Sequence, residues 1–227
     1  MIETIEHAIE ERLTLGRMQN PVRGLLNAAA AGASLVGTVL LLTRAGGDPA
    51  RQLPLLIFGV SLLGLYTVSS LYHSVPWQAA WKGRMQRLDH SMIYVLVAGT
   101  YTPIAGLMLS GWRRSGILAA VWGIAAIGIA QKLLLPHLAG WISIVLQMIQ
   151  GWLGPLVARP LAQTLPAEAL LLIAFGGLLY TVGTVLFVTR RPRLWPRVFS
   201  YHEVFHVLVV AASLTHYAAI FAFVAPA

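Results

Sequence analysis

Seven long apolar stretches constrain the fold of this 227-residue chain more than any other feature. Each is long enough to cross roughly 30 Å of hydrocarbon as an α-helix that rises about 1.5 Å per residue. Short breaks that contain glycine, proline or arginine separate them. We therefore predict an all-α fold, a polytopic membrane protein with a seven-transmembrane helix bundle over residues 21–227. The predicted spans cover residues 24–43, 53–73, 89–110, 115–135, 138–158, 167–189 and 200–224.

The composition excludes an ordinary soluble domain and limits the possible binding partners and metal ligands. Apolar residues make up 57% of the chain and charged residues only 11%, whereas about a quarter of a soluble domain is charged. The net charge of +8 is scattered among short loops, so we expect no nucleic-acid partner. No protein partner can be identified from the sequence. Because the chain has no cysteine, any zinc ion must be held by imidazole and oxygen ligands.

The N-terminal tail, residues 1–20, does not resemble a cleavable signal peptide. It contains four glutamates, whereas a secretory signal begins with a basic region followed by an apolar core. Ile2, Ile5 and Ile9 recur at helical spacing and predict an amphipathic helix on the membrane or on the bundle. A frayed surface helix is the plainer interpretation of the same pattern.

The distribution of lysine and arginine predicts the orientation in the membrane. Eleven of these residues fall in the N-terminal tail and the second, fourth and sixth loops, and five in the other loops. Cytoplasmic loops are enriched in both residue types. We therefore expect a multi-pass protein of the inner (plasma) membrane, with its N-terminus in the cytoplasm and its C-terminus outside.

Three histidines and one acid stand at the ends of predicted spans. His73 ends the second span, Asp89 opens the third, and His202 and His206 lie at the start of the seventh. The predicted topology places all four in the cytoplasmic half of the bilayer, where ionisable side chains are costly and usually functional. Residues four apart share one face of a helix. The pattern therefore predicts a metal site with His73, His202 and His206 as ligands.

Three histidine ligands with an open fourth position are typical of catalytic zinc, which lowers the pKa of a bound water. Asp89 could be a fourth ligand, or could orient the water and accept its proton. Ser69 precedes His73 by four residues and could donate a hydrogen bond in the same site. Two plainer interpretations stay open. Asp89 could be a helix-start charge paired with Arg84 or Arg87, and Ser69 could serve helix packing.

Residues 202–206 also match the H-E-x-x-H signature of zinc proteases, in which the glutamate is the general base. A five-residue pattern matches easily by chance, and no further protease motif accompanies it. We expect Glu203 to face the basic loop 190–197 instead. The remaining histidines are expected outside the metal site, in packing or loop positions: His7, His90, His137 and His216.

Several short runs of the sequence resemble a known family, and two of them are the most specific. Arg-Leu-Asp-His-Ser-Met-Ile-Tyr at 87–94 and Ala-Gly-Thr-Tyr-Thr-Pro at 98–103 are the most specific. The run 176–183 and the serine and histidine pairs named above fit in order and spacing. From about residue 20 to 222, the chain resembles the hemolysin III branch of the progestin and adipoQ receptor family, which includes adiponectin receptors.

The resemblance implies seven helices, a cytoplasmic N-terminus and a Zn2+ ion held by the three histidines, with Asp89 reaching it through water. The chain departs from the family in the first span, where bacterial relatives usually carry Glu-Glu-x-x-Asn-x-x-x-His. Asn27 fits that pattern, but Arg23, Gly24 and Ala31 stand in place of the acids and the histidine. The chain therefore lacks part of this motif, while the predicted zinc ligands are all present.

Three functions are compatible with these features. The first is a zinc-dependent hydrolase of a lipid amide or ester, involved in membrane lipid homeostasis. A membrane lipid would enter sideways from the bilayer, and the family's ceramide-hydrolysing receptors set the precedent. The second is a non-enzymatic membrane sensor or receptor-like protein in which zinc is structural. The third is a pore-forming hemolysin, against which stand the lack of a continuous polar stripe and of a secretion signal.

Overall fold

The computed structural model describes residues 18–135, 140–195 and 198–226. Seven helical segments in these ranges are long and apolar enough to cross a membrane, which confirms the predicted all-α, seven-span fold. The predicted N-terminal tail up to residue 17, together with His7 and His137, lies outside the described ranges. The elements are α2 (Pro21–Arg44), α3 (Pro49–Ser74), α4 (Ala79–Met108), α5 (Gly111–Leu134), α6 (Gly140–Gly151), the 3₁₀ helix η2 (Gly154–Val157), α7 (Ala158–Leu161), α8 (Ala167–Thr189), α9 (Tyr201–Ala219) and the π-helix η3 (Ile220–Val224).

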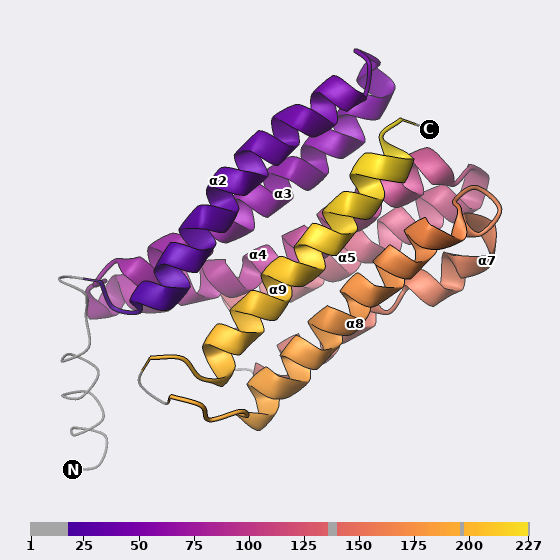
Figure 1. Cartoon of the computed structure of the whole chain (residues 1–227). Coiled ribbons are helices and arrows are strands. Elements are labelled where there is room, and N and C mark those ends of the chain that lie inside the picture. The colour runs from indigo at the N-terminus through magenta and orange to yellow at the C-terminus, as the bar shows by residue number, and fades with distance from the viewer. Residues whose placement is uncertain (1–17, 136–139, 196–197, 227) are drawn as a thin grey trace, which may run out of the picture.

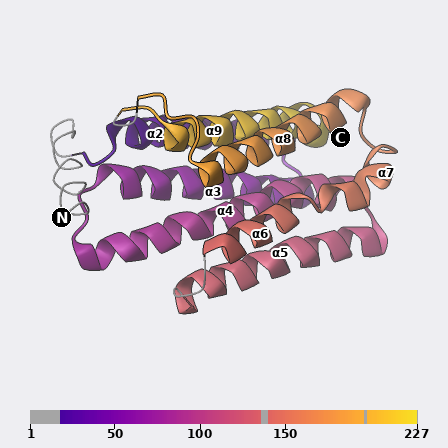
Figure 2. The same cartoon turned by 90° about the horizontal axis from the view of Figure 1, so that it is seen from below.

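The helices form one bundle in which neighbours in the chain mostly pack side by side (Figure 1). In Figure 2, α2, α9 and α8 lie along one side of the bundle, α3 and α4 occupy the middle, and α6 and α5 lie on the opposite side. The α4 helix is the most buried of the seven spans and α8 the least. The start of α2 and the end of η3 lie at opposite ends of the bundle, as an odd number of spans requires.

The main difference from the predicted boundaries is the start of α4. This helix begins at Ala79, ten residues before the predicted start at position 89. The added turns contain Lys82, Arg84 and Arg87, whose low hydropathy is typical of a loop although the residues themselves favour helix. Asp89 therefore lies well inside a helix rather than at its start. The break between the fourth and fifth spans falls at residues 136–139, outside the described ranges.

Close helix contacts depend on small residues facing larger ones. Gly99 of α4 faces the Ser61 side chain of α3, and Gly128 of α5 faces the ring of Tyr94. A methyl group at either glycine would overlap these side chains. Tyr94 is fully buried, and its hydroxyl donates to the Ser143 carbonyl over 2.9 Å. Such small-residue contacts let helix backbones approach closely where lipid tails provide no hydrophobic driving force.

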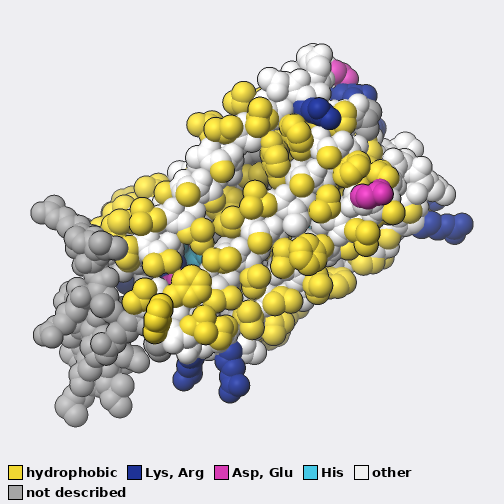
Figure 3. All heavy atoms as spheres, in the orientation of Figure 1, with side chains coloured by type: hydrophobic (Ala, Val, Ile, Leu, Met, Phe, Trp, Pro, Cys, Tyr) yellow, Lys and Arg dark blue, Asp and Glu magenta, His cyan; other side chains and the backbone are white. Residues whose placement is uncertain are grey.

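The outer surface is largely apolar, whereas the side chains at the surface of a soluble protein are largely polar. In Figure 3, apolar side chains cover the middle of the visible face, and the basic side chains lie towards its two ends. Large apolar side chains are exposed on nearly every span, among them Leu25, Val60, Ile127 and Leu171. An apolar band between charged ends is the surface expected in a bilayer. The protein is therefore a multi-pass membrane protein.

Candidate metal centre

The structure brings the three predicted histidine ligands together at one end of the bundle. His73 is the second-last residue of α3, and His202 and His206 lie in the first two turns of α9. The ring centroid of His73 lies 5.4 Å from that of His202 and 4.9 Å from that of His206. One possible ligand atom from each residue lies within 4.8 Å of the other two. Side chains 129 to 133 positions apart in sequence therefore converge on one point.

Two of the three side chains, His73 and His206, have the burial and the free nitrogens expected at a metal site. His73 is only 2% exposed, His206 is also buried, and His202 is half-buried. Within the described residues, both ring nitrogens of His73 and Nε2 of His206 lack a hydrogen-bond partner. A buried polar atom without a partner costs stability. A cation bound between the rings would satisfy these atoms, and three neutral imidazoles fit zinc.

Local hydrogen bonds hold the end of α3 and the start of α9, the two helix ends that carry the histidines. The backbone N–H of Asn20, just before α2, donates to the His73 carbonyl over 2.9 Å and joins the start of α2 to the end of α3. Ser200 precedes α9, and its backbone N–H donates to Oε2 of Glu203 over 2.8 Å. This bond belongs to a capping box, which defines the first turn of the helix that carries His202.

Ser69 lies one helical turn before His73 in α3, and Asp89 of α4 contacts Ser69 without joining the group of three histidines. Both side chains are buried, and they are hydrogen-bonded to each other across the contact between α4 and α3. Asp89 is not among the atoms that converge within 4.8 Å. This position suits a carboxylate that acts through water better than a direct ligand. The catalytic roles of Asp89 and Ser69 stay predictions.

The alternative interpretation of Asp89 as a helix-start charge paired with arginine is wrong. Asp89 lies three turns inside α4, and neither ion pair of the described residues includes it. Arg87 instead donates from Nε to the Gly83 carbonyl over 3.2 Å. The Arg84 guanidinium lies over the ring of Trp81. Because α4 begins at Ala79, Asp89 does not stand at a helix start, and both arginines precede it on the same helix.

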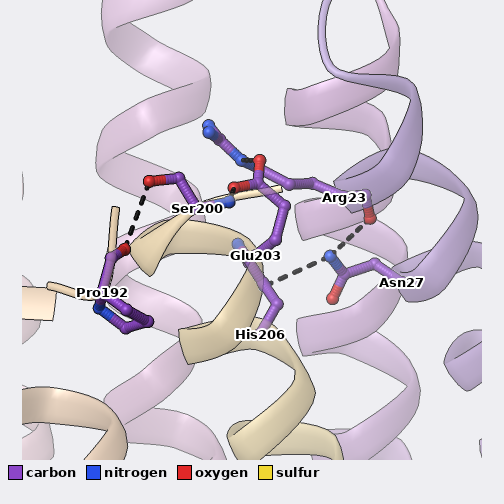
Figure 4. A network of polar contacts seen from close by, with 6 residues as sticks. All are labelled: Arg23, Asn27, Pro192, Ser200, Glu203 and His206. Carbon is purple, nitrogen blue, oxygen red and sulfur yellow. Dashed lines mark hydrogen bonds and ion pairs between the residues drawn. The ribbon is translucent and has the colours of Figure 1, made fainter. Parts of the chain in front are cut away.

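Glu203 does not face the basic loop as expected. Its Oε1 accepts a hydrogen bond from Nε of Arg23 in α2 over 2.6 Å, while Oε2 accepts the backbone N–H of Ser200 (Figure 4). Both carboxylate oxygens are therefore engaged away from the centre of the three imidazoles. A protease of the H-E-x-x-H type needs this glutamate as a general base, so the geometry argues against that function.

Asn27 is the second α2 residue that contacts the first turns of α9. Its Nδ2 donates to the Arg23 carbonyl over 2.8 Å and lies 3.3 Å from Nδ1 of His206 (Figure 4). The predictions from sequence did not anticipate contacts of Arg23 or Asn27 with the start of α9, and they considered Glu203 only as the base of a protease motif or as a residue facing the basic loop. The Ser-x-x-Glu pattern at residues 200–203 could have identified Glu203 as a capping residue. No signal in the sequence indicates its pairing with Arg23.

His90 and His216 lie outside the group of three, as predicted. His216 is a buried residue ten positions after His206 in α9, and its Nε2 lies 3.0 Å from the Ile173 carbonyl of α8. Its ring centroid is 5.7 Å from that of Tyr180. These contacts make it a packing residue between α8 and α9.

Comparison with known proteins assigns the chain to a family. The Haemolysin-III related family matches residues 17–217. Hemolysin-3 homolog of Bacillus subtilis (strain 168) is 35% identical over 157 residues, which are 69% of this chain and 70% of that protein. Hemolysin-3 of Bacillus cereus is 31% identical over 195 residues, 85% of this chain and 86% of that protein.

A more distant relative is the Adiponectin receptor protein of Drosophila melanogaster. It is 23% identical over an alignment 205 residues long that covers 71% of this chain and 41% of that protein. The matches agree with the resemblance seen in the sequence, and the residues matched by the family, 17–217, include all three histidines. The chain belongs to the Haemolysin-III related family, as a multi-pass membrane protein with seven candidate spans.

Proposed function

We propose that this protein is a zinc-dependent hydrolase that acts on a lipid amide or ester within the membrane. The observation that supports this most is the group of three imidazoles, two of which have buried nitrogens without a partner among the described residues, together with the buried Ser69 one turn before His73 and the buried Asp89 that it contacts. A purely structural bundle has no need of such costly groups at one point in its interior. Membrane-embedded sites of this kind suit a substrate that is itself a lipid.

Each residue has a role that follows from its position. His73, His202 and His206 would hold the zinc ion, which would supply a Lewis acid that polarises a carbonyl and lowers the pKa of water. Asp89 would accept a proton at its carboxylate during attack and return it to the leaving group. The Ser69 hydroxyl would orient that carboxylate through the hydrogen bond that joins them.

Access from the bilayer supports a lipid substrate. Two phenylalanines lie at this end of α9: the Phe187 ring centroid is 5.1 Å from that of His202 and 5.0 Å from that of Phe205. In Figure 3 a small part of a histidine side chain is visible among the apolar side chains of this face. His202 also keeps part of its surface exposed. A hydrophobic chain could therefore lie against the bundle while its polar linkage reaches the imidazoles.

A structural role for zinc is the second candidate. The α3 and α9 helices make few close backbone approaches, yet they supply all three histidines. A cation bound there would fasten these two helices together and stabilise the bundle, as in a sensor or receptor-like protein. Pore formation is the third candidate, and it rests on the names of the two Bacillus relatives alone.

Turnover of defined lipids separates the first two candidates. Purified protein in detergent should release fatty acid from at least one member of a panel of ceramides, other N-acyl lipids and glycerol esters. Removal of zinc by a chelator should stop the release, and added zinc should restore it. His202→Ala should be inactive, whereas His216→Ala, a matched change on the same helix, should keep activity. Zinc-loaded protein that hydrolyses no lipid on the panel would contradict the hydrolase and favour the structural role.

A further inference from the structure

A hollow of about 480 Å³ lies in the segment that joins α8 to α9. Thr189, Arg191, Pro192 and Arg193 line it. Both arginines are exposed, and neither takes part in an ion pair with any described residue. The hollow therefore presents two basic residues whose positive charge no acid in the described part of the chain neutralises.

This segment lies where the headgroups of a bilayer are expected. It directly follows α8, one of the seven candidate spans, and its Leu194 and Trp195 side chains are exposed. Exposed tryptophan beside arginine is typical of the interface between hydrocarbon and headgroups. Lipid phosphates lie at the same level, and the planar guanidinium group of arginine pairs well with phosphate oxygens. A lipid phosphate is therefore the ligand that best fits the hollow.

Two contacts connect the hollow to the candidate metal centre. In α8, Phe187 precedes Thr189 by two residues, and its ring centroid lies 5.1 Å from that of His202. Before α9, the Ser200 hydroxyl donates to the Pro192 carbonyl over 3.3 Å, two residues ahead of His202 (Figure 4). His202 is the half-buried member of the three histidines, whereas the other two are buried. The hollow and the most accessible of the three imidazoles are therefore neighbours.

We propose that this hollow binds the phosphate headgroup of a phospholipid and holds the ester or amide linkage of that lipid beside His202. The proposal rests on the proposed hydrolase function and narrows its substrate to lipids that carry a phosphate close to the linkage. Only a few bonds separate these two groups in a phospholipid, so one molecule can reach both places. A lipid without phosphate lacks the group that Arg191 and Arg193 would bind.

Headgroup binding can be measured without turnover. The probe is a fluorescent phosphatidic acid with ether-linked chains, which has no ester or amide to hydrolyse. The reference is the dialkylglycerol with the same fluorophore and no phosphate. Both are titrated into the purified full-length protein in a neutral detergent. We expect the probe to bind roughly 25-fold more tightly than the reference, because each arginine near a membrane surface strengthens attraction to an anionic lipid about 5-fold.

The double variant Arg191→Gln/Arg193→Gln should lose this preference for the probe. Lys82→Gln/Arg84→Gln is the matched control, because it removes two positive charges from the start of α4, which the basic residues predict on the same side of the membrane. The control should bind the probe like the unmutated protein. Equal weakening in both double variants would show attraction to net charge alone and would overturn the proposal. Inorganic phosphate that binds as tightly as the probe would also overturn it.

Turnover distinguishes failure of this proposal from failure of the proposed function. With ester-linked phosphatidic acid, Arg191→Gln/Arg193→Gln should raise KM roughly 25-fold and keep kcat, because a headgroup held throughout the reaction contributes uniform binding. Its zinc content and melting temperature should not change. Equal KM of the unmutated protein for phosphatidic acid and diacylglycerol would overturn the headgroup site and keep the hydrolase. Binding of the ether-linked probe through the two arginines without hydrolysis of any lipid would contradict the hydrolase and keep the headgroup site.

Discussion

Arg23 and Glu203 lie 180 positions apart in the sequence, yet Nε of Arg23 lies 2.6 Å from Oε1 of Glu203. The pair joins the first turn of α2 to the first turn of α9 beside the three histidines. Its side chains are 20% and 7% exposed, so water only partly screens it. Glu203 also accepts the backbone N–H of Ser200, so one carboxylate both starts α9 and fixes its position against α2.

The two roles of Glu203 can be separated by a double-mutant cycle. Glu203→Gln keeps a capping side chain at this position but removes the charge, and Arg23→Gln removes the other charge. We expect each single change to lower the free energy of unfolding by about 1.5–3 kcal/mol, the range for a hydrogen bond to a charged group. The double variant should lose less than the sum of the two. Thermal unfolding in detergent provides the measurement, and simple additivity would show that the pair does not stabilise the protein.

The seven spans could be predicted from sequence because hydropathy depends only on local composition. The start of α4 could not be predicted in this way. Residues 79–88 are polar enough to be typical of a loop, yet they continue the helix beyond the apolar stretch. Helix formation and membrane insertion are separate properties, and a helix can extend past the hydrocarbon when its charged end reaches water. The early start changed the interpretation of Asp89, which depends on where the helix begins.

The grouping of the three histidines could be predicted because their spacing and their positions at span ends are visible in the sequence. The contacts of Arg23 and Asn27 could not, because they depend on how α2 is rotated and shifted against α9. The two helices are at opposite ends of the chain, so no local pattern constrains that register. Asn27 was recognised as part of a family motif, but its contact with His206 required the structure.

The contact between α5 and α4 allows a sharp test of packing. Gly128→Ala should lower the free energy of unfolding by about 1–3 kcal/mol, the usual cost of overpacking a core. Its added methyl group would overlap the ring of Tyr94, which is fully buried and held by Ser143. Gly116→Ala is the matched control on the same helix, since a methyl group there meets open space. Equal stability of the two variants would show that the close approach of Gly128 to Tyr94 does not contribute to the free energy of unfolding.

Substitution of Asp89 distinguishes a catalytic role of the protein from a purely structural role of its metal. Asp89→Asn should keep zinc, because the three histidines still hold it, but should lower any lipid hydrolysis by at least roughly 100-fold, the scale of losing a positioned base. Ser69→Ala removes the hydrogen bond to Asp89 and should cause a smaller loss. Zinc content and turnover are measured on the same sample. Undiminished turnover in Asp89→Asn would remove this residue from the mechanism.

The orientation in the membrane can be tested with reporter fusions. A periplasm-active enzyme fused to the C-terminus should work and a cytoplasm-active one should be silent, because the excess of basic residues lies in the even-numbered loops and the N-terminal tail. Insertion of the same reporters between α8 and α9 should give the opposite pattern. The reverse result at both positions would overturn the predicted topology.

The metal content of the purified protein tests the central claim most directly. Protein prepared without chelators should contain one zinc ion per chain by elemental analysis, because three neutral imidazoles from two helices form a preorganised site. His206→Ala should lose the metal and unfold at a lower temperature, while His216→Ala should keep the metal. Unmutated protein with no bound metal, or equal zinc in the two variants, would contradict the claim that His73, His202 and His206 form a zinc site.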